Sequence, residues 1–219
     1  MTVRTVDRLE DVPDPAPDAD YVVVDVLISS TSIVRLLEAG ADYVRPFADP
    51  EAARAFKAET GAVLLGEQGG QPVEGFDGSP LPSTVPDDVA GRPVGLLTSN
   101  GTRAVQRIGH DRDVFVGTTV NAAAVAETLA DRDGEAWLVA AGRAGDRTPE
   151  DSAGVELVAR HYRDDLTDEA AAALAEQVRE SGTAEWFRDI GFDHEVEALL
   201  AFDTSDTVPH LRDGRFVEA

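Results

Sequence analysis

The chain contains no cysteine, and this absence removes several kinds of chemistry. Disulfide bonds, thiolate metal sites and cysteine nucleophiles are excluded, and cysteine-based phosphatase chemistry is excluded with them. Four histidines are present, and they show no metal-ligand spacing: His110, His161, His194 and His210. We predict that they are structural or surface residues.

Lysine is nearly absent, because Lys57 is the only one in the chain. Asp and Glu total 42 against 19 Lys and Arg, which gives a net charge of −23. Carboxylates at this density, with Arg in place of Lys, indicate adaptation to a high-salt cytoplasm, where screening weakens self-repulsion. We predict a halophilic, acidic protein without nucleic-acid or anionic-membrane partners. The patterned apolar segments argue against a disordered acidic chain.

Long hydrophobic runs are also missing. The stretch from Met1 to Glu10 lacks the apolar core of a signal peptide, and no window approaches the roughly 18 uninterrupted apolar residues of a membrane span. These absences predict a cytoplasmic location. A length of 219 residues with 42% apolar residues suits one domain over residues 1–219. The oligomeric state stays open, with a homo-oligomer among the options.

Strand and helix patterns alternate along the first two thirds of the chain. Short apolar runs predict strands at 21–27, 43–45, 62–65, 93–97, 113–117 and 135–141, and helical patterns follow most of them. The last third contains helical patterns and then a hairpin or terminal strand at 208–217. This order predicts an α/β fold, a three-layer α/β/α sandwich with a mainly parallel or mixed central sheet and extra helices in the C-terminal third.

A polar turn follows the strand at 93–97. Asn100-Gly101 can supply positive φ, and Ser99 or Thr102 can cap the helix that begins near Arg103, so several backbone N–H groups would point to one place. Such a place attracts phosphate. The alternative is an ordinary β–α turn with a good cap.

Carboxylates follow several other strands. Asp25 lies inside an apolar run, which indicates a metal ligand or a cap of a neighbouring loop. Glu67, Glu74 and Asp77 belong to a long glycine-rich loop, 66–80, of a kind that is usually functional or disordered. Glu150 and Asp151 begin a helix, where they could complement the helix dipole or one could reach a metal.

All of these loops follow predicted strands, so they could share one cleft beyond the carboxyl ends of the sheet. Clustered N–H donors and hydroxyls beside carboxylates suit a phosphate ester with a divalent cation. Other phosphate and hydrolase motifs are missing: a P-loop, an Asp-x-Asp pair after the first strand, and a Gly-x-Ser-x-Gly elbow.

The order of these motifs resembles the 2-phosphosulfolactate phosphatase family over nearly the whole chain. The matching segments are Asp25-Val-Leu with its Ser/Thr tail, Leu65-Gly-Glu67, Gly75-Phe-Asp, Thr98-Ser-Asn-Gly-Thr-Arg103, Asn121-Ala, Ala141-Gly-Arg with Glu150-Asp151, Gly191-Phe with Asp203, and Val208-Pro209. The resemblance implies a Mg²⁺-dependent phosphatase that converts 2-phospho-3-sulfolactate to 3-sulfolactate, a step toward coenzyme M.

The resemblance also implies roles for individual residues. Asp25, Glu67 and Asp151 would hold Mg²⁺ and act in catalysis. A larger set would bind the small phosphorylated acid: Ser30, Thr31, Thr98, Ser99, Asn100, Gly101, Thr102, Arg103, Asn121 and Arg143.

The chain departs from the family pattern at three places. Ile28 and Gln68 stand where the family usually has arginine, and the loop around Asp77-Gly78-Ser79 is shorter and lacks an asparagine. Losing guanidinium groups removes charge-assisted contacts to an anion, each worth about 1.5–3 kcal/mol. Two alternatives therefore stay open: the same chemistry on another, less anionic phosphomonoester, and a non-catalytic anion-binding protein.

Overall fold

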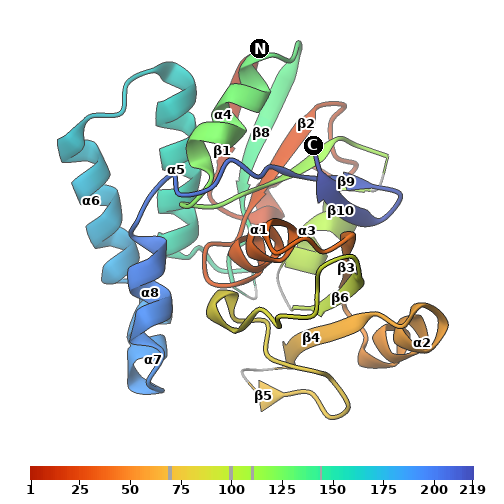
Figure 1. Ribbon diagram of the computed structural model, residues 1–219. Helices are drawn as coiled ribbons and strands as arrows, with labels where there is room; N and C mark the ends of the chain where they lie inside the picture. The colour runs from red at the N-terminus through yellow and green to blue at the C-terminus, as the bar shows by residue number, and fades with distance from the viewer. Residues whose placement is uncertain (69–70, 99–100, 110, 144) are drawn as a thin grey trace.

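A mixed β-sheet runs through the whole molecule in the computed structural model (Figure 1), which describes residues 1–68, 71–98, 101–109, 111–143 and 145–219. In this part of the chain the sheet has ten strands in the order β1-β8-β2-β7-β9-β10-β3-β6-β4-β5. The strands are β1 (Thr2–Val6), β2 (Asp20–Val24), β3 (Tyr43–Phe47), β4 (Val63–Gln68), β5 (Gln71–Pro72), β6 (Pro93–Leu97), β7 (Val114–Gly117), β8 (Glu135–Ala140), β9 (Pro209–Arg212) and β10 (Arg215–Glu218).

Helices cover both faces of this sheet. They are α1 (Ser29–Glu38), α2 (Pro50–Thr60), α3 (Gly101–Ile108), α4 (Ala122–Ala130), α5 (Pro149–Arg163), α6 (Asp168–Arg179), α7 (Gly182–Asp189) and α8 (Asp193–Leu199), with short 3-10 turns at Leu9–Asp11 and Pro82–Thr84. Alternate residues of β2 show the two faces: Tyr21 and Val23 pack with α1 and α3, and Val22 and Val24 pack with α4 and α5. The predicted three-layer α/β/α sandwich is confirmed.

The C-terminal hairpin joins two parallel halves of the sheet. β1, β8, β2 and β7 are parallel to one another, as are β3, β6 and β4. β9 pairs antiparallel with β7 through Phe115 and His210, and β10 pairs antiparallel with β3 through Phe216 and Val44. The predicted hairpin therefore lies inside the sheet, where it closes the gap between the halves (Figure 1).

Two segments differ from the sequence-based expectations. β1 was not expected, because only Val6 of its five residues is buried and an exposed edge strand leaves little apolar pattern. β2 ends at Val24, so Asp25 follows the strand instead of lying inside it, and α1 begins at Ser29. The Ser/Thr tail therefore forms the first turn of α1.

The extra helices of the last third pack at one side of the sheet, beyond α5 (Figure 1). Leu174 and Val178 of α6 are buried in the same cluster as Val155 and Leu157 of α5. α7 and α8 form a smaller cluster around Phe187. Among the described residues, no helix is both long and apolar enough to cross a lipid bilayer.

Candidate active site

A cavity of about 640 Å³ lies beyond the carboxyl ends of β2, β4 and β8. Four predicted site residues line it: Asp25, Glu67, Arg143 and Asp151. Glu150, which was weighed against Asp151 as a metal ligand, lines it as well. In parallel α/β sheets ligands bind at this edge, and the loops that carry the carboxylates share this cavity, as predicted, whereas the described part of the loop after β6 does not line it.

Asp25 sits in the turn between β2 and α1. Its carboxylate accepts hydrogen bonds from the N–H and the hydroxyl of Ser29, at 3.3 and 2.8 Å. Its own N–H donates to Ser30 Oγ at 2.9 Å. The carboxylate thus caps the first turn of α1, which is the alternative that the sequence left open, and it faces the cavity at the same time.

Asp151 belongs to the first turn of α5. Its Oδ1 accepts the N–H of Val26 at 2.8 Å, and its Oδ2 accepts the N–H of Gly142 at 3.0 Å. These bonds tie α5 to the segments that follow β2 and β8. Gly142 has φ +65°, and a Cβ there would lie 2.4 Å from the backbone oxygen of Asp146, so only glycine fits this turn without a shift.

Glu150 differs from its neighbour in its hydrogen bonds. It is 2% exposed, and within the described chain its Oε2 is buried without a hydrogen-bond partner. A buried carboxylate oxygen without a partner is costly, unless a cation or another donor occupies the space beside it. The N-terminal end of α5, where Glu150 lies, offsets a part of this cost through the helix dipole.

The three buried carboxylates repel one another. Burial raises the pKa of Asp25 to about 6; hydrogen bonds from Ser29 lower it, and the charge of Glu150 raises it further. Burial also raises the pKa of Asp151 well above its usual value, and the charges of Asp25 and Glu150 add to that shift. At neutral pH such a group is stabilised by a proton or by a cation.

These residues fit a magnesium ion. In the described ranges no group of three or more Asp, Glu, His or Cys side chains is arranged as a metal site. Mg²⁺ does not require one, because it usually takes one or two carboxylates and completes its octahedron with water and substrate phosphate. The unpartnered Oε2 of Glu150 beside Asp25 matches this ligand set.

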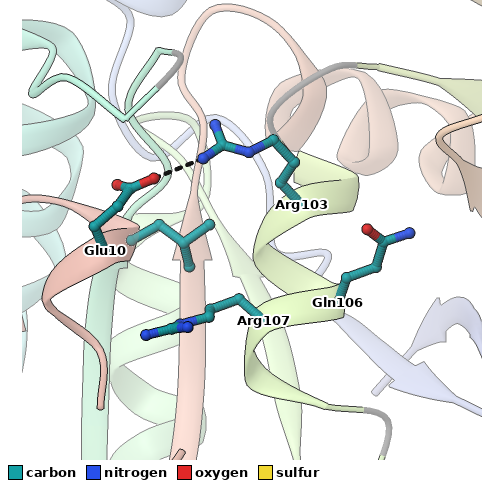
Figure 2. Close-up of a pocket in the computed structure, with 5 residues that line it drawn as sticks. Glu10, Arg103, Gln106 and Arg107 are labelled. Atoms are coloured by element: carbon teal, nitrogen blue, oxygen red, sulfur yellow. Dashed lines mark hydrogen bonds and ion pairs between the residues drawn. The ribbon is translucent and has the colours of Figure 1, made fainter. Parts of the chain in front are cut away.

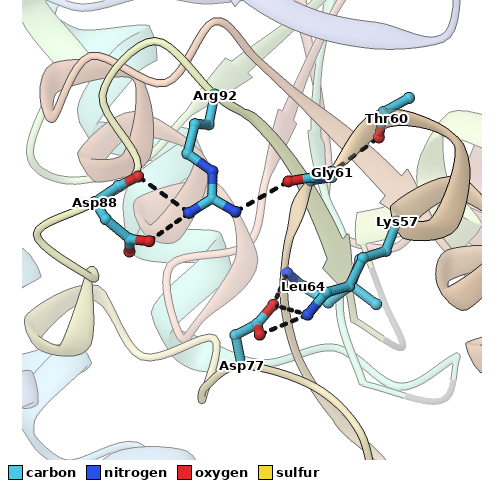
Figure 3. Close-up of polar contacts among 8 residues, drawn as sticks. Lys57, Thr60, Gly61, Leu64, Asp77, Asp88 and Arg92 are labelled. Atoms are coloured by element: carbon cyan, nitrogen blue, oxygen red, sulfur yellow. Dashed lines mark hydrogen bonds and ion pairs between the residues drawn. The ribbon is translucent and has the colours of Figure 1, made fainter.

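The glycine-rich loop contributes only a part of its acids to the cavity. Glu67 lines it from the end of β4, together with Gln71, Pro72, Ser79 and Pro80. Asp77 instead accepts the Leu64 N–H at 2.8 Å and the Lys57 ammonium at 2.5 and 2.7 Å (Figure 3). Burial alone would raise the pKa of Asp77, but the hydrogen bonds from Leu64 and Lys57 outweigh it and the pKa is lowered. Because these bonds reach β4 and α2, Asp77 holds the loop against both elements.

Four of the predicted substrate-binding side chains form hydrogen bonds inside the protein. Thr31 Oγ1 donates to the Val26 carbonyl, Thr102 Oγ1 donates to the Phe47 carbonyl, and Ser30 Oγ donates to the Val23 carbonyl. The Asn121 amide binds only backbone groups, those of Thr118, Val116 and Thr207. Within the described chain these four residues and Thr98 lie outside the cavity lining. Ser99 and Asn100 lie outside the described residues, and Gly101 begins α3. The substrate-binding role of this set stays a prediction.

Arg103 lies in a second, smaller cavity of about 350 Å³, with Leu9, Glu10, Gln106 and Arg107 (Figure 2). Its guanidinium binds the Glu10 carboxylate at 2.6 Å. Arg143 is thus the one cation in the described lining of the carboxylate cavity, against four carboxylates. Arg103 and Arg143 therefore line different cavities, and the predicted role of both in binding one substrate stays a prediction.

Comparisons with known proteins point to one family. A family model described as 2-phosphosulpholactate phosphatase matches residues 6–214. A protein of Carboxydothermus hydrogenoformans is 32% identical over 219 residues, covering 92% of this chain and 91% of its own length. A protein of Prochlorococcus marinus (strain MIT 9313) is 36% identical over 195 residues, covering 87% and 78%. Both relatives are named "Probable 2-phosphosulfolactate phosphatase".

Proposed function

The chain belongs to the 2-phosphosulfolactate phosphatase family of phosphoric monoester hydrolases, and from this premise we propose that it hydrolyses 2-phospho-3-sulfolactate to 3-sulfolactate and phosphate with Mg²⁺. The observation that supports this proposal is the single cavity that Asp25, Glu67, Glu150, Asp151 and Arg143 all line. A coenzyme M pathway would be the corresponding context.

Each part of the cavity has a proposed role. Asp25 and Glu150 would hold Mg²⁺, with Glu67 as a further ligand, and Asp151 is held by two backbone N–H groups. When bound, Mg²⁺ would supply charge that neutralises ester oxygens and polarises a water. Arg143, which is exposed at the cavity, binds the phosphate oxygens. Water bonds to phosphorus as the ester P–O bond breaks, and the alcohol leaves with a proton.

A second candidate is the same reaction on a less anionic phosphomonoester. The specific observation in its favour is that Ile28 lines the cavity at a position where the resembled family usually has arginine. 2-Phosphosulfolactate carries a phosphate, a sulfonate and a carboxylate, whereas the described lining offers one guanidinium. Without further cations this substrate would be repelled by the acidic wall.

The proposed reaction is tested by phosphate release from 2-phosphosulfolactate in molar KCl. We expect turnover with Mg²⁺ and its loss when a chelator replaces the metal. Phospholactate, which lacks the sulfonate, serves as the matched substrate. Release from phospholactate alone would support the less anionic substrate, and no release from either ester by a folded sample would contradict the proposed hydrolysis.

A further inference from the structure

One face of α7 forms a wall of the active-site cavity. Thr183, Trp186, Phe187 and Ile190 all line it, and their spacing of three or four residues places them along one side of the helix and the residue that follows it. The carboxylates come from other elements: Asp25 follows β2, Glu67 lies at the end of β4, and Glu150 and Asp151 belong to α5. The cavity therefore has an acidic part and, beside it, a part formed by α7.

Large apolar side chains are exposed on this face. Trp186 is 37% exposed and Ile190 is 45% exposed, and they are the exposed large hydrophobic residues of the described chain. Both line the cavity. Scattered apolar residues are common on protein surfaces, but two that face one ligand cavity mark a binding surface.

The wall is fixed in place by packing beneath it. Phe187 is 1% exposed, and its ring meets that of Trp186 edge to face, with 5.1 Å between centroids and 89° between planes. Phe187 packs with Ala184 and Val196, and Leu27, Ile28, Leu81 and Phe192 pack against this cluster. Those four residues also line the cavity, so the apolar surface continues from α7 to the segment beside Asp25.

Size and charge both favour an apolar occupant for this part. The cavity of about 640 Å³ is of the size that encloses drug-sized ligands, and a small phosphorylated acid would fill only a part of it. The charged groups of the described lining are four carboxylates and Arg143, none of which belongs to α7. A second anionic group of a substrate would meet no cation on the cavity-lining face of α7, whereas an apolar group of a substrate would bury apolar surface there.

We propose that the site also takes phosphomonoesters whose alcohol carries an aryl or bulky alkyl group, with that group packed on Trp186 and Ile190. Hydrolysis of these apolar esters rests on the proposed function, but binding of their apolar group to α7 does not. Water bonds to phosphorus, the ester P–O bond breaks, and the apolar alcohol leaves with the proton that the water gives up. No oxidant or second substrate is needed.

The preference is measured with two alkyl phosphates of similar leaving group, propyl phosphate and 3-phenylpropyl phosphate. With Mg²⁺ in molar KCl we expect kcat/KM to be about tenfold higher for the phenyl ester, because part of the phenyl surface leaves water. Trp186→Ala should bring the ratio of the two kcat/KM values close to one, and Ile190→Ser should lower it. Glu185→Ala, an exposed neighbour outside the cavity lining, should keep the ratio of the unaltered protein.

Binding is measured separately with propylphosphonate and 3-phenylpropylphosphonate, which are not hydrolysed, by calorimetry. If the phenyl compound binds more tightly and Trp186→Ala abolishes this difference, the apolar subsite is supported. This holds even when neither ester is hydrolysed, because the lack of hydrolysis contradicts only the proposed function. Equal binding and equal turnover would overturn the inference. The inference would also be overturned if the protein were a dimer that Trp186→Ala dissociates while the preference between the two esters stayed unchanged. This face of α7 would then be a contact between two copies of the chain.

Discussion

Replacing Asp25 by asparagine is expected to lower kcat/KM for Mg²⁺-dependent phosphate release by about a thousandfold. The carboxylate is buried beside Glu150, and removing its charge weakens the proposed metal site. Metal ions supply several kcal/mol of transition-state stabilisation, and each 1.4 kcal/mol corresponds to about a tenfold change in rate. Glu150→Gln should have a similar effect, because its Oε2 is the carboxylate oxygen without a partner in the described chain.

The matched control is Asp88→Asn, which removes the same charge from an exposed residue paired with Arg92 (Figure 3). Its activity should stay within about twofold of the unaltered protein, as surface ion pairs contribute little. Circular dichroism checks that each variant is folded. A folded Asp25→Asn protein with full Mg²⁺-dependent activity would contradict the assignment of Asp25.

The second large effect is on stability in the absence of metal. The pKa of Asp25 is about 6 in the folded protein, because the carboxyl is buried, and close to the ordinary aspartate value of 3.8 in the unfolded chain. Between these values only the unfolded chain has lost the proton, so stability falls as pH rises through this window and then levels off. At about 1.4 kcal/mol per pKa unit, the cost above pH 6 is on the order of 3 kcal/mol.

This cost is measured as the difference in unfolding free energy between Asp25→Asn and the unaltered protein, in chelator, from about pH 4 to about pH 7.5. The variant should gain on the order of 3 kcal/mol relative to the unaltered protein across that range. Titrations remote from Asp25, such as that of His210, cancel in the difference. That of Asp151 does not cancel fully, because the charge of Asp25 helps to raise its pKa. Saturating Mg²⁺ should restore stability in the unaltered protein and have little effect on the variant. A difference that is flat with pH would show that Asp25 carries no such cost.

Local chemistry made much of the fold predictable. Asp49-Pro50 begins α2, since the Asp49 carboxylate accepts the N–H groups of Glu51 and Ala52. Glu150 and Asp151 stand in the first turn of α5, as predicted. The position of the C-terminal hairpin was not predictable, because its place between β7 and β3 depends on pairings between residues about a hundred or more positions apart.

The sequence predicted at which edge of the sheet the candidate site lies. Carboxylates that follow parallel strands meet there, which is why Asp25, Glu67 and Asp151 line one cavity. The family resemblance named Asp151, not Glu150, as a metal ligand, and the sequence alone could not test that choice because both residues stand in the first turn of α5. In the structure Asp151 is bound by two backbone N–H groups, and its role toward a metal stays a prediction. The α7 wall was also missed: helical periodicity identifies an apolar face but does not tell which cavity it meets.

Locating a divalent cation tests the central claim most directly. Crystals grown with Mn²⁺, which takes oxygen ligands as Mg²⁺ does, would show the metal by anomalous diffraction. A peak in contact with Asp25 and Glu150 is the predicted result. A peak elsewhere in the molecule, with that part of the cavity free of metal at saturating Mn²⁺, would contradict the proposed site.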